Sequence, residues 1–291
     1  MSLTYYNPVY DGDIVYSCDM VRLKFHISKF NSQAFLDFIH HAEYRLDFMY
    51  DYFKSSKVGT YRHLFSCKYS RGNFTLGCDL QEPSFSEGMN CMIEFNPNKN
   101  DMDYMKSVLN EFAYFIKPIE SKYYQLVRWD LAVDIPVERD NVILIKRGKR
   151  EYHRIISTSL TEYVGRRNTN GFCKVYDKKE ESNLDDVLTR IELTCDSLDT
   201  FSFPSVHILQ EVERDDFTAL NSTDIVLVNL IRRLDYDEQQ QALKSLGRSK
   251  REKLREYIFP FEREFQFNVY KVQFVVSSIL EFMTNFKGNL F

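Results

Sequence analysis

The sequence predicts an α+β protein: a curved, mainly antiparallel β-sheet platform with helices packed on one side. Short segments in which polar and apolar residues alternate, typical of half-buried strands, recur along the chain. Segments with helical spacing of apolar residues stand between groups of these strands. Two of the strands contain an apolar-Glu-apolar triplet, Ile93-Glu94-Phe95 and Ile191-Glu192-Leu193, which hints at an internal pseudo-repeat of two halves.

The first half begins with an alternating strand over Met20–Ile27. A helix is expected over 32–54, because Asn31 or Ser32 provides a cap and apolar residues follow at helical spacing. Short strands separated by glycine-bearing turns are expected at 61–69, 73–79 and 90–95. A second helix is expected over 101–116, ending before Pro118.

The second half repeats this order with a strand over 127–134, a basic loop, and strands near 158–164, 171–176 and 188–194. We therefore predict one α+β domain over 1–220, with halves 1–120 and 121–220.

The pattern changes from Thr223 onward. A helix is expected over 223–246, capped by Ser222 or Thr223, and a basic helix over 248–255. The apolar tail, 265–286, is rich in β-branched residues and is compatible with either a helix or a strand. We predict that 221–291 forms a helical, basic region packed on the same domain.

The composition limits the classes of protein to which the chain can belong. The 291 residues are 44% hydrophobic and 27% charged, which is typical of a soluble globular chain. The six cysteines are scattered without a CxxC pair, which argues against a zinc site and a disulfide framework. The chain lacks a signal peptide and an apolar run of membrane-spanning length, so we expect a cytoplasmic protein with no membrane partner. The P-loop, GxGxxG, HExxH and GxSxG motifs are also missing, which disfavours motor ATPases, dehydrogenases, zinc proteases and serine hydrolases.

Three predicted strands each place chemically active side chains on one face, because side chains alternate between faces along a strand. The sets are Arg128, Asp130 and Asp134, then Lys174, Tyr176 and Lys178, then Arg190 and Glu192. If the three strands are neighbours, a phenol, carboxylates and cations meet on one surface. This combination suits phosphoryl transfer, which uses a hydroxyl nucleophile, carboxylates for a divalent cation, and cations for phosphate.

Tyr176 is the candidate nucleophile. A phenol has a pKa of about 10 and needs a nearby cation, metal or base to become reactive at neutral pH. Lys174 and Lys178 flank it at roughly 7 Å along a strand, and we predict that they and Arg190 stabilise phosphate charge. The alternative is an interior tyrosine with solvated lysines, since the chain contains 19 tyrosines.

The predicted metal site is built from carboxylates. Along one strand Asp130 and Asp134 are roughly 13 Å apart, too far to share an ion whose oxygen ligands lie at about 2–2.5 Å. We therefore pair Asp130 with Glu192, with Asp134 as a further ligand or, alternatively, a turn or cap residue. Glu94 and Glu162 are secondary candidates. None of the six histidines forms a His-x-His triplet, so the expected ion is Mg²⁺ or Mn²⁺.

Two basic patches are candidate DNA contacts. The first is a loop containing Arg147, Lys149 and Arg150, followed along the chain by Arg166 and Arg167. The second lies in the predicted basic helix and contains Lys250, Arg251 and Lys253; it is either a recognition helix or a solvated helix. The net charge of −4 does not exclude DNA, because local patches decide such binding.

Four segments, taken in order, resemble the Rep_trans family of rolling-circle plasmid replication initiators and the related conjugative relaxases. They are Arg-Trp-Asp-Leu-Ala-Val-Asp (128–134), Tyr-Val-Gly-Arg-Arg-Asn-Thr-Asn (163–170), Lys-Val-Tyr-Asp-Lys-Lys-Glu (174–180) and Thr-Arg-Ile-Glu-Leu (189–193). The likeness covers 127–194. Arg166 replaces the family's usual small residue after the glycine, and Lys174 replaces its arginine, which keeps the charge but loses the bidentate fork for phosphate.

The resemblance implies an activity and partners. The tyrosine that matches Tyr176 attacks one DNA strand at the single-stranded nick site of a hairpin in the double-strand origin and becomes joined to the 5′ phosphate. The resemblance also implies a divalent metal, a homodimer and a host helicase as partner.

We therefore expect a plasmid rolling-circle replication initiator that nicks and religates DNA. One alternative is a conjugative relaxase of the same family, which often carries an extra N-terminal DNA-binding domain; a first strand near Met20 leaves little room for one. The other alternative is a non-catalytic DNA-binding regulator on the same fold.

Overall fold

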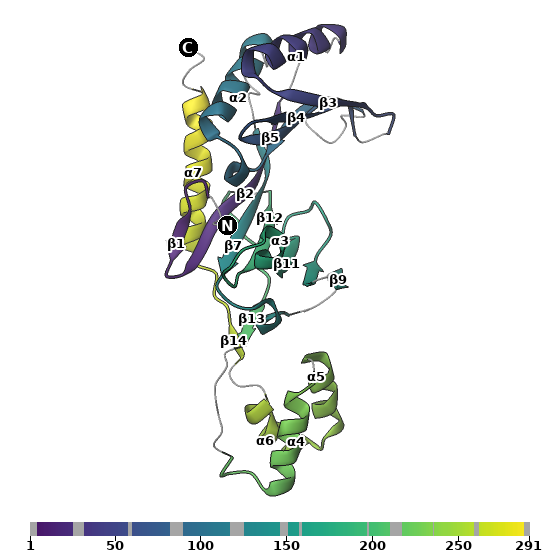
Figure 1. Ribbon diagram of the computed structural model, residues 1–291, viewed down its shortest axis with the longest axis vertical. Coiled ribbons are helices and arrows are strands. Elements are labelled where there is room, and N and C mark those ends of the chain that lie inside the picture. The colour runs from purple at the N-terminus through teal and green to yellow at the C-terminus, as the bar shows by residue number, and fades with distance from the viewer. Residues whose placement is uncertain are drawn as a thin grey trace.

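The structure is a computed structural model that describes residues 5–25, 32–57, 60–81, 90–116, 125–145, 151–156, 159–196, 198–209, 217–234, 236–258 and 262–287. An open antiparallel sheet of 11 strands forms its centre, and helices pack around the sheet (Figure 1). This architecture confirms the predicted α+β class.

The order of strands on one side of the sheet's centre mirrors the order on the other side. The main path runs β3–β4–β5–β6–β2–β7–β12–β11–β10–β9. The first-half strands are β2 (Ile14–Phe25), β3 (Met49–Lys54), β4 (Tyr61–Tyr69), β5 (Gly72–Leu80) and β6 (Cys91–Phe95). The second-half strands are β7 (Gln125–Ile135), β9 (Tyr152–Ile156), β10 (Leu160–Val164), β11 (Cys173–Asp177) and β12 (Thr189–Cys195).

This mirrored order agrees with the predicted pseudo-repeat. Each half contributes its first strand, β2 or β7, to the central pair, and its last strand, β6 or β12, lies next to that strand. The triplets around Glu94 and Glu192 therefore lie on equivalent strands. A short strand, β1 (Val9–Asp11), extends β2 as a hairpin.

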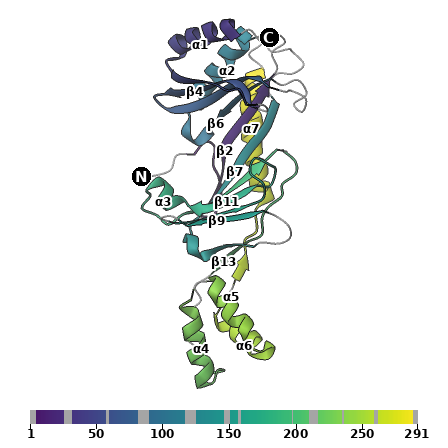
Figure 2. The same cartoon turned by 90° about the vertical axis from the view of Figure 1, so that its right-hand side faces the viewer.

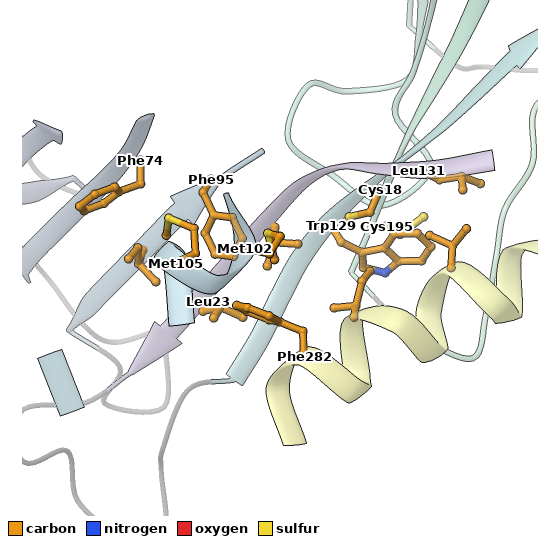
Figure 3. Close-up of a cluster of buried hydrophobic side chains, with 14 of the residues drawn as sticks. Cys18, Leu23, Phe74, Phe95, Met102, Met105, Trp129, Leu131, Cys195 and Phe282 are labelled. Atoms are coloured by element: carbon orange, nitrogen blue, oxygen red, sulfur yellow. The ribbon is translucent and has the colours of Figure 1, made fainter. Parts of the chain in front are cut away.

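The main core lies between one face of the sheet and three helices, α1 (Ser32–Leu46), α2 (Met102–Ile116) and α7 (Val269–Lys287). Trp129 of β7 is fully buried, and in Figure 3 it lies with Cys18, Leu131 and Cys195 above α7. Phe282 of α7 packs edge-on against Phe95 of β6, with ring centroids 5.9 Å apart. Burial of such rings holds both halves of the sheet on one apolar layer, and the opposite face is left for polar residues.

The predicted helix over 32–54 is wrong in its second part. The helix ends at Leu46, Asp47 adopts a left-handed φ of 52°, and Met49–Lys54 forms the edge strand β3. A left-handed residue cannot continue an α-helix, and the aromatic residues that follow favour a strand.

The C-terminal segments also differ in detail. The predicted helix over 223–246 is two helices, α4 (Ser222–Arg232) and α5 (Tyr236–Ser245), and the basic helix is α6 (Arg248–Ile258). The tail that fitted either a helix or a strand is the helix α7. The short strands β4, β5 and β6 and the strands β7, β10, β11 and β12 agree with the prediction to within a few residues.

The region 221–291 is made of two parts. Helices α4, α5 and α6 have their own apolar core around Val228, Leu243 and Leu254, at the end of the molecule beyond β13 (Figures 1 and 2). After α6, β14 (Glu262–Glu264) pairs with β13 (Val206–Leu209), which also pairs with β8 (Val142–Leu144). The chain then returns to the main core as α7.

Two further findings concern the cysteines and the helices. All six cysteines are buried, and each is a free thiol. Among the helices in the described ranges, none combines the length and the apolar character needed to span a bilayer.

Gly77 of β5 offers a test of the packing in the first half. A Cβ at this position would lie 2.7 Å from Cγ of Tyr61, so we expect Gly77→Ala to lower the free energy of unfolding by about 1–3 kcal/mol through overpacking. Urea denaturation measures this change. Gly247→Ala is the control, because nothing lies within 4 Å of a Cβ there. An equal loss in both variants would contradict this account of the packing.

Candidate functional site

The three strands that carry the predicted site are neighbours in the order β7–β12–β11. Their register places Tyr176 opposite Arg190, which in turn is opposite Asp134. In the next row, Lys174 is opposite Glu192. These side chains lie on the face of the sheet away from Trp129 and α7, because side chains alternate along each strand. The predicted juxtaposition of a phenol, carboxylates and cations is therefore present.

Tyr176 is bound to a carboxylate. Its hydroxyl donates to Oε1 of Glu192 at 2.6 Å, and the ammonium of Lys174 lies 3.6 Å from the centre of its ring. The residue is only 3% exposed. Burial raises the pKa of the phenol far above its usual value, and the negative charge of Glu192 raises it further. In this state the phenol is protonated and needs activation before it can attack.

Glu192 accepts the hydrogen bond of the Tyr176 hydroxyl. Burial raises the pKa of its carboxyl group, while the positive charge of Lys174 acts in the opposite direction. Nζ of Lys174 lies 3.9 Å from its second oxygen, Oε2. A carboxylate with a raised pKa and a hydrogen-bonded phenol is suited to accept the phenolic proton.

Arg190 is held by two carboxylates. Its Nε and Nη2 donate to the two oxygens of Asp134, both at 2.6 Å, and its Nη1 donates to Oδ1 of Asp19 at 3.1 Å. The hydroxyl of Tyr5 donates to the same Asp134 carboxylate at 2.6 Å. Burial alone would lower the pKa of Arg190, but the hydrogen bonds and charge of Asp134 outweigh it and raise the pKa. Arg190 therefore holds the carboxylates of Asp134 and Asp19 together, and it is not among the residues that line the cavity described below.

Asp134 differs from both of its predicted roles. It is neither at a turn nor open to an ion: β7 continues to Ile135, and Asp134 is fully buried against Arg190. Both of its oxygens accept hydrogen bonds within the protein. A metal ligand at this position would have to give up the guanidinium pair.

The sequence analysis missed Asp19. This residue lies at a register shift of β2, between Cys18 and Met20, where the strand bulges against β7. Its carboxylate accepts from Arg190 and from the Asn96 amide, which lies next to the short helix η2 (Pro97–Lys99) of the first half. Burial acts to raise the pKa of Asp19, but the Arg190 charge and the Asn96 hydrogen bond outweigh it, and the pKa is lowered. A bulge breaks the two-residue period, so alternation alone did not reveal this residue.

Asp130 lies one row from Glu192, on the strand next to it. Nη2 of Arg128 donates to its Oδ2 at 2.9 Å, and Nη1 of Arg128 donates to Oδ1 of Asn168 at 2.7 Å. Burial raises the pKa of Asp130, although the Arg128 hydrogen bonds act against this. Because Asp130 is opposite Thr194 and Glu192 is opposite Ala132, the two carboxylates are diagonal neighbours, at positions typically about 7–8 Å apart.

A cavity of about 720 Å³ opens over this face. It is lined by cations, carboxylates and aromatic rings from both halves of the sheet. The lining residues that bear on the chemistry are Arg22, Glu94, Arg128, Asp130, Tyr163, Arg167, Phe172, Lys174 and Glu192. Arg22 and Glu94 pair with each other, with Nε of Arg22 donating to Oε2 of Glu94 at 2.6 Å.

Two residues of the predicted site, Lys178 and Glu162, are not among those that line this cavity. Lys178 does not continue the strand: Asp177 caps the short helix α3 (Lys178–Ser182), and Lys178 is buried in an ion pair with Glu181. Its ammonium is still 5.8 Å from the centre of the Tyr176 ring. Glu162 lies on the opposite face of the sheet, where Arg139 and the Tyr152 hydroxyl each donate to it at 2.5 Å.

The predicted DNA contacts fall into three groups. Arg147, Lys149 and Arg150 lie outside the described residues. Arg166 and Arg167 are exposed in the loop between β10 and β11, and Arg167 lines the cavity. Lys250 and Lys253 of α6 pair with Asp224 of α4 at 3.0 and 3.4 Å, and the guanidinium of Arg251 donates to the carbonyl of Leu246 at 3.1 Å. The basic helix thus uses these three residues to hold the α4–α6 unit together.

The chemical type of the candidate ligands, carboxylate oxygens, suits a hard cation. Asp130 and Glu192 supply carboxylate oxygens at the wall of one cavity, and oxygen is the donor that Mg²⁺ and Mn²⁺ prefer. Within the ranges that the structure describes, no three His, Cys, Asp or Glu side chains converge. Mg²⁺ commonly takes one or two carboxylates and completes its shell with water and substrate phosphate.

Comparisons with known proteins give a structural likeness. No family model matches the chain, and no curated protein matches it significantly. A solved structure of a rolling circle replication initiator protein from Geobacillus stearothermophilus is similar at 14% identity, over 86% of this chain and 98% of that chain, with a TM-score of 0.36. A TM-score this low does not establish a shared fold.

The buried Arg190–Asp134 pair can be tested by removing one partner. We expect Asp134→Ala to lower the free energy of unfolding by about 3–5 kcal/mol, because Arg190 keeps a buried charge with half of its partners gone. Urea denaturation measures this loss. Asp103→Ala is the control, since the Asp103 side chain is 93% exposed and its pair with Lys106 contributes little. A loss below 1 kcal/mol in Asp134→Ala would contradict the role given to the pair.

Proposed function

We propose that the protein initiates rolling-circle replication of a plasmid by nicking one DNA strand with Tyr176. The observation that carries the proposal is the hydrogen bond of 2.6 Å from the Tyr176 hydroxyl to Glu192, beside Lys174 and a cavity lined by arginines. The motifs around this cluster resemble those of the Rep_trans initiators. The homodimer and the host helicase that this resemblance implies stay predictions.

The proposed step is a transesterification. The phenolic oxygen of Tyr176 forms a bond to the phosphorus of the scissile phosphate, and the bond between phosphorus and the 3′ oxygen breaks. The phenolic proton passes to Glu192, which already accepts it in a hydrogen bond. The released 3′ oxygen takes up a proton, and the 5′ phosphate stays joined to Tyr176. Attack by a 3′ hydroxyl on this phosphotyrosine reverses the step and religates the strand.

The cations around the cavity offset the charge of the phosphate. Lys174 lies beside both the Tyr176 ring and Glu192, where it stabilises a developing phenolate and the attacked phosphate. Arg128 and Arg167 line the same cavity. Arg190 contributes indirectly, because it holds Asp134 and Asp19 in place next to the site.

Asp130 and Glu192 would hold the divalent cation, which when bound would polarise the scissile phosphate and offset its charge. Both residues have raised pKa values caused by burial. Positive charge placed beside them favours their ionised forms.

A non-catalytic DNA-binding regulator is the second candidate, and one observation favours it. Tyr176 is 3% exposed, and its pKa is raised far above the ordinary value. Nucleophilic attack requires the substrate to reach the phenol and the phenol to lose its proton. A regulator needs neither of these. The two functions differ in whether a covalent DNA adduct forms.

Tyr176→Phe separates these functions. With supercoiled plasmid that carries the cognate origin and Mg²⁺, we expect nicking and the covalent adduct to disappear, with origin binding kept within about threefold. Gel electrophoresis detects the nick, and denaturing gels of labelled DNA detect the adduct. Tyr152→Phe is the matched control, because Tyr152 donates a similar hydrogen bond to Glu162 on the opposite face of the sheet. An adduct that persists in Tyr176→Phe would rule out this nucleophile.

The metal ligands can be tested by the same reaction. We expect chelation by EDTA to stop nicking, and Asp130→Asn or Glu192→Gln to lower the rate at least about 100-fold with a higher Mg²⁺ requirement. Glu94→Gln is the matched control, because Glu94 lines the cavity at the equivalent strand of the first half but pairs with Arg22. If all three variants lose activity equally, the metal does not bind at the Asp130 and Glu192 pair.

A further inference from the structure

A row of side chains crosses the open face of the sheet from aromatic to charged residues. The register places His153 of β9 opposite Tyr163 of β10, Tyr163 opposite Lys174 of β11, and Lys174 opposite Glu192 of β12. Adjacent strands are about 4.8 Å apart. The row therefore leads, within about 10 Å, from an aromatic ring to the carboxylate that binds Tyr176.

Aromatic and apolar groups gather at the outer end of this row. The rings of Tyr163 and Phe172 are nearly parallel, 20° apart, with centroids separated by 6.1 Å. Both side chains are partly exposed, and both line the cavity together with Ile155, which is 53% exposed. They lie on the face of the sheet that faces away from the apolar core, where burial of the core gives no reason for apolar rings.

The loop between β10 and β11 brings the two rings together. Gly165, Asn168 and Gly171 have left-handed φ values of 92°, 65° and 77°, so the loop turns back sharply. Its ends approach closely: a Cβ at Gly165 would lie 3.4 Å from the carbonyl oxygen of Gly171. Asn168 accepts a hydrogen bond from Arg128, which ties the loop to the Asp130 side of the site. Phe172 follows directly and is held beside Tyr163.

We propose that Tyr163 and Phe172 form a stacking subsite for one unpaired nucleobase next to the phosphate that Tyr176 attacks. This proposal rests on the function proposed above and assigns two residues of this chain to the single-stranded nick site that the resemblance implies. A base offers a flat π face to an aromatic ring only when it is out of the duplex stack. Lys174, directly opposite Tyr163, is one strand away and in reach of the phosphate of the same nucleotide.

The distribution of apolar and charged groups in the cavity supports a bound strand whose base lies on the rings and whose phosphate lies at the cations. One wall carries the rings of Tyr163 and Phe172 and the aliphatic side chain of Ile155, while Lys174, Arg128 and Arg167 also line the cavity and provide cations. Proteins that bind single strands combine a positively charged track for phosphates with rings for the bases. A paired base, whose faces are covered by its neighbours, gains nothing from the aromatic wall. The subsite therefore selects melted DNA at the point of cleavage.

The test compares a base-bearing strand with a base-free strand. The probes are oligothymidine of about 12 nucleotides and an abasic phosphodiester chain of the same length, each labelled for fluorescence anisotropy. All proteins carry Tyr176→Phe and are free of added metal, so that neither probe is cut. We expect the parent protein to prefer oligothymidine. In Tyr163→Leu/Phe172→Leu this preference should fall by about 5- to 100-fold, with binding of the abasic chain unchanged.

Two controls keep the result specific. Phe172→Tyr retains an aromatic ring and should keep the preference for oligothymidine. Tyr270→Leu removes a ring that is 77% exposed on α7, outside the cavity lining, and should have no effect. Unchanged preference in the double leucine variant would overturn the proposal, and so would an equal loss of affinity for both probes. Because binding is measured without cleavage, failure here leaves the Tyr176 adduct assay as a separate test of the proposed function.

Discussion

The arrangement of the site depends on one buried interaction, the guanidinium of Arg190 between two carboxylates. Arg190 lies on β12, Asp134 on β7 and Asp19 on the bulge of β2, so a single side chain joins three adjacent strands. The bond from Arg190 to Asp19 crosses the centre of the sheet, and Asn96, which donates to Asp19, extends the connection further into the first half. Since a buried ion pair is costly to break, it fixes the register of β12 against β7. The chemistry proposed for the phenol needs this register, because a slip of β12 by one residue would turn Glu192 to the core.

The two halves of the sheet carry different residues at equivalent positions. The registers of β5 with β6 and of β11 with β12 place Gly77 where the second half has Tyr176, and Met92 where it has Arg190. Glu94 is retained at the position equivalent to Glu192, but it is neutralised by Arg22. The first half thus has the same strand order but carries neither the phenol nor the buried guanidinium at these positions. Its remaining contribution to the cavity is the Arg22–Glu94 pair at the wall.

The sequence predicted the parts of this site that depend on local rules. Alternation along strands assigned Tyr176, Lys174 and Glu192 to one face, and the structure confirms that face and shows that the three strands are neighbours. Long-range and irregular features were beyond such rules. The bulge at Asp19, the pairing of Asp134 with Arg190 and the use of Lys250 and Lys253 to bind Asp224 each depend on a partner distant in the chain or on a broken period. The end of α1 was missed because a single left-handed residue, Asp47, stops a pattern that otherwise continues to suit a helix.

The α4–α6 unit enters and leaves the main domain through adjacent strands. β13 precedes it, β14 follows it, and the two pair antiparallel with His207 opposite Glu264. Its own apolar core is separate from that of the sheet. The unit is therefore an insertion at the tip of a hairpin, and its two ends already lie at the spacing of a pair of strands. Such an insertion can be exchanged for another domain, or shortened to a turn, without rearranging the strands that carry Tyr176. The α4–α6 unit and the sheet that carries the site can thus change independently in evolution.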